Sequence, residues 1–144
     1  MSIALMAGEH RVGRQAFSTY HKDIASMLTG LLLKESLSDV SVLDLLRITK
    51  TESWQVTNAA AYQPTTWTAM SFEAEESQAI TIAEKLSRAL KPQWYINAST
   101  PSQVYVIFPC KVFMYPKGDS QQRAAAQQYG RSLGIPDSQL DWSE

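Results

Sequence analysis

Residues 108–113, FPCKVF, contain the only cysteine of the chain and are the first place where the residue types could support chemistry. A cysteine becomes a nucleophile when a helix N-terminus, a histidinium or a cluster of cations lowers its pKa. Lys111 is one such cation, but neighbouring side chains in a strand point to opposite faces. Strand-like segments flank Pro109 and Cys110, and proline favours the first central position of a tight turn. We therefore expect a structural turn cysteine.

The two histidines, His10 and His21, lie far before Cys110 in the chain. They leave open the alternative of a small cysteine-dependent enzyme in which His21 serves as a distant base. Two histidines and one cysteine at these positions match no metal-ligand spacing. The sequence also contains no Gly-rich phosphate-binding motif. We predict no catalytic residues, no metal and no other cofactor.

Composition places the chain among ordinary globular proteins. It has 144 residues, of which 44% are hydrophobic and 19% charged, enough to bury a core in one domain. A single cysteine cannot form an internal disulfide. The apolar start has no basic region before it, and the longest apolar run is too short to span a bilayer. We expect a soluble cytoplasmic protein without a membrane partner.

The net charge of −1 conceals an asymmetry along the chain. Residues 35–84 carry eight acidic side chains against two basic ones, and residues 85–135 carry seven basic ones against one acidic. Such a division can attract a partner or a second copy of the molecule, unless the two halves interleave in the fold and their fields cancel.

The early part of the chain favours helix. Residues 10–34 have apolar side chains at three- and four-residue steps, which predicts an amphipathic helix. Residues 36–49 are ambiguous, because Ser38 or Asp39 could cap a short helix while the β-branched residues also suit a strand. We favour the short helix, which gives an N-terminal helical segment over about 10–48.

The body of the chain, about 52–134, combines strands with helices. Segments 52–58 and 65–74 are rich in Trp, Thr, Val and Phe, which predicts two strands. Segment 73–92 has helical periodicity, with acidic residues at its start and basic residues at its end. Short links favour an antiparallel meander for the next three strand-like segments, which are 93–98, 103–108 and 111–116.

A final helix is predicted over about 120–133, with a stop at Gly134. In the tail, 135–144, Leu140 and Trp142 are apolar and spaced to dock on the body or on a second copy, because burying an indole is worth about 2–3 kcal/mol. The fold expected is a single α+β domain, in which an antiparallel sheet of four to five strands packs against two to three helices.

Alternation along the last strands divides their aromatic side chains between two faces. One face must pack against helices, and the other then carries more aromatics than an ordinary solvated surface. If neither a helix nor the tail covers it, this second face is a binding surface. The predicted partner-binding residues are Tyr95, Lys111, Phe113, Tyr115, Lys117, Arg123 and Arg131.

These observations favour a non-catalytic binding module that associates with a protein partner or with a second copy of itself through the aromatic-bearing face. The alternative is single-stranded nucleic-acid binding, since aromatics flanked by cations can stack bases. That alternative lacks both the RNP-type consensus and an overall basic charge.

Overall fold

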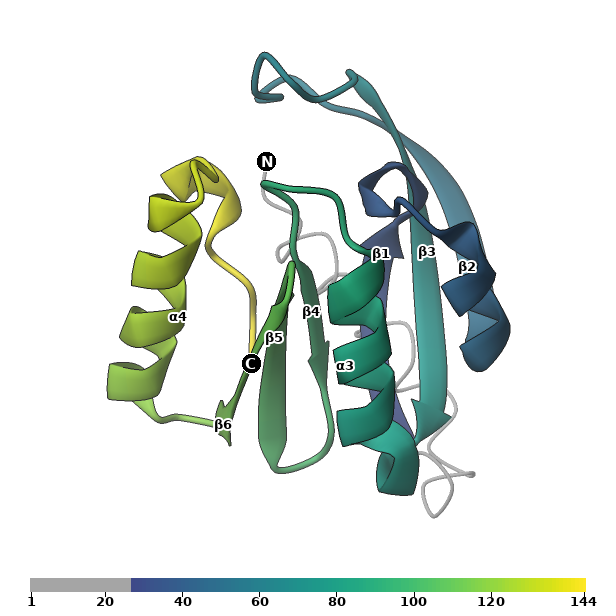
Figure 1. Ribbon diagram of the computed structural model, residues 1–144, viewed down its shortest axis with the longest axis vertical. Helices are drawn as coiled ribbons and strands as arrows, with labels where there is room; N and C mark the ends of the chain where they lie inside the picture. The colour runs from purple at the N-terminus through teal and green to yellow at the C-terminus, as the bar shows by residue number, and fades with distance from the viewer. Residues whose placement is uncertain (1–26) are drawn as a thin grey trace.

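A six-stranded antiparallel sheet organises residues 27–144, the part of the chain that the computed structural model describes (Figure 1). The spatial order of its strands is β2-β3-β1-β4-β5-β6. This arrangement confirms the α+β fold with an antiparallel sheet, although six strands exceed the predicted four to five. The strands are β1 (Met27–Leu33), β2 (Arg47–Gln55), β3 (Thr66–Glu75), β4 (Ile96–Ser99), β5 (Gln103–Phe108) and β6 (Lys111–Pro116).

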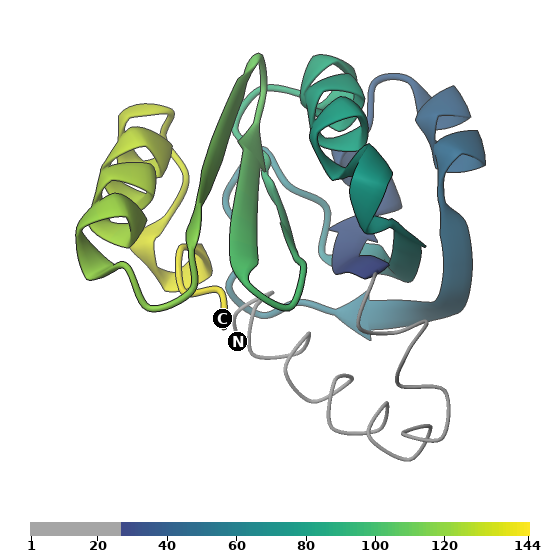
Figure 2. The same cartoon turned by 90° about the horizontal axis from the view of Figure 1, so that it is seen from below.

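Two α-helices of the described residues lie on opposite sides of the β5–β6 hairpin (Figure 2). Four short 3-10 helices complete residues 27–144. The α-helices are α3 (Ala79–Ala89) and α4 (Ser120–Ser132), and the 3-10 helices are η2 (Lys34–Ser36), η3 (Val40–Leu45), η4 (Glu76–Gln78) and η5 (Asp137–Gln139).

The first predicted helix, 10–34, is wrong over residues 27–33, which form β1, and Lys34 begins η2. Residues 10–26 of that prediction lie outside the described residues. The run MLTGLLL is buried on both sides as the central strand of the sheet, and a short apolar run of this kind cannot be assigned from periodicity alone. Gly30 has a packing role there, because an added Cβ would lie 2.7 Å from Phe72 Cζ and 2.8 Å from the Asn97 carbonyl oxygen.

The ambiguous segment 36–49 contains both structures that it suggested. Asp39 caps η3, since its Oδ1 accepts a hydrogen bond from the Ser41 backbone N–H at 3.0 Å. The chain then becomes extended, and β2 begins at Arg47. The local capping residue therefore set the start of the helical turn, while pairing with β3 set the strand that follows.

The sheet separates two apolar clusters, and alternation along β5 shows how. Tyr105 and Ile107 point to the side that α3 covers, which we call the α3 face. Val104, Val106 and Phe108 point to the opposite side, which we call the α4 face. Successive residues of β5 thus belong alternately to the two apolar clusters.

Helix α3 is held above the β5–β6 hairpin by two hydrogen bonds near its C-terminal end. Ser87 Oγ donates to the Phe108 carbonyl at 2.6 Å, and the Cys110 backbone N–H donates to the Ser87 carbonyl at 3.2 Å. Just before the other end of the helix, Glu76 of η4 lies near Tyr105, because burial and then the Glu76 charge raise the pKa of the Tyr105 hydroxyl. Since Tyr105 pairs with Met114 in the neighbouring strand, α3 runs antiparallel to β6.

Candidate functional site

The aromatic face predicted from the last strands is present, and the chain itself covers it. Tyr95, Phe113 and Tyr115 lie on the α4 face in one cluster with residues of α4 and of the tail. Tyr95 is 5% exposed and Tyr115 is 1% exposed. The face is therefore not the open surface that the sequence analysis expected, because Leu140 and Trp142 fill the space between α4 and the sheet.

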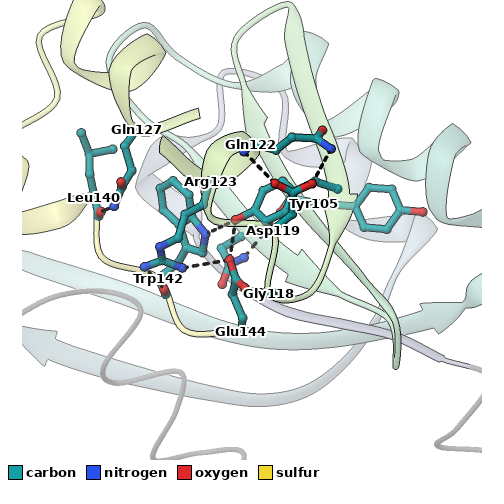
Figure 3. Close-up of polar contacts among 11 residues, drawn as sticks. Tyr105, Gly118, Asp119, Gln122, Arg123, Gln127, Leu140, Trp142 and Glu144 are labelled. Atoms are coloured by element: carbon teal, nitrogen blue, oxygen red, sulfur yellow. Dashed lines mark hydrogen bonds and ion pairs between the residues drawn. The ribbon is translucent and has the colours of Figure 1, made fainter. Parts of the chain in front are cut away.

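Trp142 is the centre of this covering layer (Figure 3). Its side chain is fully buried, and its indole Nε1–H donates to the Tyr115 hydroxyl at 2.8 Å. The Arg123 guanidinium lies 5.0 Å from the indole ring centroid and also donates to the Trp142 carbonyl at 2.6 Å. Burial, a satisfied N–H and a cation–π contact thus act on one side chain.

Leu140 enters the same layer through a gap that a glycine leaves. An added Cβ at Gly130 of α4 would lie 2.6 Å from Leu140 Cδ2, so the two residues are complementary in size. The Leu140 carbonyl accepts a hydrogen bond from Gln127 Nε2 at 2.9 Å. Both apolar tail residues therefore dock on the body of the same chain, one of the two places that the sequence allowed.

The Glu144 carboxylate joins the tail to three separate groups of the body. It accepts hydrogen bonds from the Tyr115 hydroxyl at 2.8 Å, from the Gly118 backbone N–H at 2.9 Å and from Arg123 Nη1 at 3.1 Å. Desolvation opposes ionisation of this carboxyl, but the three hydrogen bonds and the Arg123 charge outweigh it and lower the pKa of Glu144 below the ordinary 4.5.

The net pKa shift of the two covered tyrosines is in the opposite direction. Desolvation is the main cause that raises the pKa of Tyr95 and of Tyr115 well above the ordinary 10.0. Both hydroxyls are therefore neutral near pH 7, and the Tyr95 hydroxyl donates a hydrogen bond to the Gln139 carbonyl. These groups act as hydrogen-bond donors that fasten the tail.

The two predicted arginines each form an ion pair with a carboxylate of the same chain. Arg123 forms an ion pair with Glu144 at 3.1 Å, and only 27% of its side chain is exposed. Arg131 Nε lies 2.5 Å from Asp137 Oδ1. Both side chains thus fasten the segment that follows α4, a role that their position in the sequence does not reveal.

The two predicted lysines lie at opposite ends of β6. Lys111 begins the strand, with its Nζ 5.3 Å from the ring centroid of Phe113. Lys117 follows the strand, and its backbone N–H donates to the Ser102 carbonyl at 3.0 Å. The cations therefore do not flank an open row of aromatic rings of the kind that stacks bases.

Cys110 occupies the turn predicted for it. Phe108 pairs with Lys111, which leaves Pro109 and Cys110 as a two-residue loop, and Cys110 has a φ of 60°. Its thiol is free and the residue is exposed. The histidines proposed as distant partners lie outside the described residues. Within residues 27–144, no group of three His, Cys, Asp or Glu side chains is arranged to hold a metal ion.

The open surface at the β6 end of the sheet was not predicted from the sequence. Val112 and Met114 lie on the α3 face of β6, and Met114 is 46% exposed. Ile80, which is 55% exposed, lies two helical turns before Ser87 and so on the flank of α3 that faces β6. We call these three residues the β6 flank. The position of β6 could have indicated this surface, because the last strand of a meander commonly lies at the edge of its sheet.

A second exposed apolar region lies between η3 and α3. It is a cleft of about 400 Å³ lined by Asp39, Ser41, Val42, Leu45, Lys85, Arg88 and Ala89. Leu45 is 41% exposed there, similar to Met114 in the β6 flank. The cleft has a charged rim of both signs, whereas the β6 flank is apolar.

Comparisons with protein-family models, with curated proteins and with solved structures give no match for this chain. None of the described helices has the length and apolar composition needed to cross a bilayer. The sheet edge and its flank therefore have to be interpreted from their own chemistry.

The role of Trp142 predicts a large loss of stability when it is truncated. Trp142→Ala is expected to lower the free energy of unfolding by about 3–5 kcal/mol, because it empties a fully buried site. Deleting residues 137–144 is expected to cost at least as much. Trp142→Phe keeps most of the apolar contact and should cost less. Thermal unfolding followed by circular dichroism checks the order, and an unchanged melting temperature for Trp142→Ala would contradict it.

The Glu144 contacts predict a pH dependence. Because the pKa of Glu144 is lowered in the folded chain, its contribution is complete above the unfolded value near 4.5 and is lost as the pH falls through the folded value. Glu144→Gln should destabilise the protein by about 1 kcal/mol at pH 7, and the difference from the wild type should shrink below pH 4.5. Urea unfolding at several pH values measures it, and a difference that is constant down to pH 3 would exclude this role.

Proposed function

We propose that this chain is a non-catalytic interaction module that associates with a second copy of itself through the β6 end of its sheet. The observation that supports the proposal is the β6 flank, in which the exposed Ile80 and Met114 and the partly buried Val112 lie beside an unpaired strand edge. Apolar surface next to unpaired backbone groups is the combination that sheet-to-sheet association uses.

The other edge of the sheet differs in the features that prevent association. Strand β2 carries the charged residues Arg47, Lys50 and Glu52, and its pairing with β3 is irregular between Ile48 and Lys50. Charges and bulges of this kind are how proteins protect a sheet edge. Strand β6 pairs with β5 in regular register from end to end, so the two edges are not equivalent.

A nucleic-acid partner gains less support from the same geometry. The rings that would stack bases, Tyr95 and Tyr115, are buried under the tail. Arg123 and Arg131 are paired with carboxylates of the chain. Apolar self-association requires neither open rings nor free cations, so it agrees better with the surface that the chain exposes.

Self-association is tested by sedimentation velocity over a wide concentration range. The wild type is expected to form a dimer whose population rises with concentration. Met114→Lys should weaken the dimer at least tenfold, because it places a charge in the apolar contact. Leu45→Lys is the matched control, since Leu45 is similarly exposed but lies in η3, and it should leave the dimer intact. A monomeric wild type at every concentration would refute the proposal.

A further inference from the structure

The hydrogen-bonding pattern of β6 follows from its two-residue turn. In such a hairpin the residues that flank the loop form a hydrogen-bonded pair, here Phe108 and Lys111. Hydrogen-bonded and non-hydrogen-bonded pairs then alternate along the strands. The backbone groups of Lys111, Phe113 and Tyr115 therefore point toward β5, and those of Val112 and Met114 point away from the sheet.

Pro116 agrees with this assignment. It occupies the next outward position, opposite Gln103, where a strand residue needs no N–H for the ladder. Its carbonyl accepts a hydrogen bond from the Asp119 backbone N–H at 3.1 Å. The open part of the edge is thus limited to Val112 and Met114, whose outward groups are paired with no other strand of residues 27–144.

We propose that β6 pairs antiparallel with β6 of a second copy, in the register that places Val112 opposite Met114 of the other copy. This pairing rests on the proposed self-association and specifies its geometry. A twofold axis passes beside Phe113, and the outward groups of Val112 and Met114 exchange four hydrogen bonds across it. The edge is self-complementary in this register, because each copy supplies two donors and two acceptors at matching positions.

Charge complementarity on the α4 face favours a second copy of the chain as the partner that pairs with the β6 edge. In the proposed register Lys111 stands opposite Tyr115 of the other copy. The Tyr115 hydroxyl is bonded to the Glu144 carboxylate, so the Lys111 ammonium of each copy approaches an anion of the other. Two such contacts form, one on each side of the axis, and an unrelated apolar strand would not supply them.

The α3 face contributes a second complementary arrangement. Edge-to-edge pairing about this axis places the two α3 helices on the same side of a continuous sheet, running in opposite directions. The exposed Ile80 of each helix lies on the flank that is turned toward the other copy. The apolar row of Val112 and Met114 from both copies fills the space between the helices.

Cysteine cross-linking tests the register in the full-length chain. Val112→Cys and Met114→Cys are made separately in a Cys110→Ser background, and each protein is oxidised alone and as an equal mixture. Hydrogen-bonded antiparallel partners have Cα atoms about 5.5 Å apart, within the range that a disulfide spans, whereas like positions in this register lie beyond about 7 Å. The mixture should form a 112–114 disulfide several-fold faster than either protein alone, as identified by peptide mass spectrometry.

The outcomes separate this pairing from the proposed function. A wild type that never dimerises overturns both. A wild type that dimerises while the mixture cross-links no faster than the single variants overturns the pairing alone. Val40→Cys in the same background is the control, because Val40 is 51% exposed in η3, and its cross-linking should stay slow in every mixture.

Proline at the outward position provides an independent test. Met114→Pro removes an N–H that points away from β5, so the hairpin can keep its own ladder while the proposed donor is lost. The variant should sediment as a monomer at concentrations where the wild type is dimeric, and Met114→Val, which keeps the N–H, should remain dimeric. A dimeric Met114→Pro with wild-type sedimentation overturns the pairing. Should the proline variant unfold, the mixed cross-link still decides the register.

Discussion

Burial of Trp142 between α4 and the sheet is the contact on which the second layer of this domain depends. Helix α4 exposes many of its residues, and its fully buried positions, Ala126 and Gly130, are small. Its Tyr129 adds a partly buried ring against Phe108 and Phe113. Apart from this ring, the helix brings little apolar surface of its own to the sheet. The tail supplies the missing volume with Trp142 and Leu140, and the polar groups around them fix its position.

The same contact decides which surface remains available to a partner. By filling the α4 face, the tail removes Tyr95 and Tyr115 from solvent, whereas Met114 on the α3 face of β6 remains exposed. An interaction that uses the sheet is thereby moved from the broad aromatic face to a narrow edge. The packing of the tail on the α4 face thus determines which part of the sheet a partner can reach.

Much of the fold could be predicted from the sequence, because several segments carry strong local signals. The meander of β4, β5 and β6 follows from alternating β-branched and aromatic residues with short links, and α3 follows from its periodicity. The acidic residues expected at the start of that helix lie before it instead, in β3 and η4. The β1 segment failed for a physical reason: a leucine-rich run suits a helix as well as a buried strand, and only pairing with β3 and β4 distinguishes them.

The candidate site was predicted less well, because exposure is not a local property. Tyr95 and Phe113 alternate as expected, but the tail that covers their face lies far from them in the sequence. Arg123 and Arg131 were interpreted as part of a binding surface, while their partners, Glu144 and Asp137, lie outside the segment that suggested it. Met114 gave a signal only through its position in the last strand of the sheet.

The central position of β1 has a consequence for how the chain is made. Its partner strands, Thr66–Glu75 and Ile96–Ser99, are synthesised after it, one on each side. As the chain emerges from the ribosome, the run MLTGLLL is exposed first and remains without its second neighbour until β4 has left the exit tunnel. An apolar strand with at least one open edge during this interval is a site for premature aggregation and for chaperone binding. The central strand of the mature sheet is thus a vulnerable segment of the nascent chain.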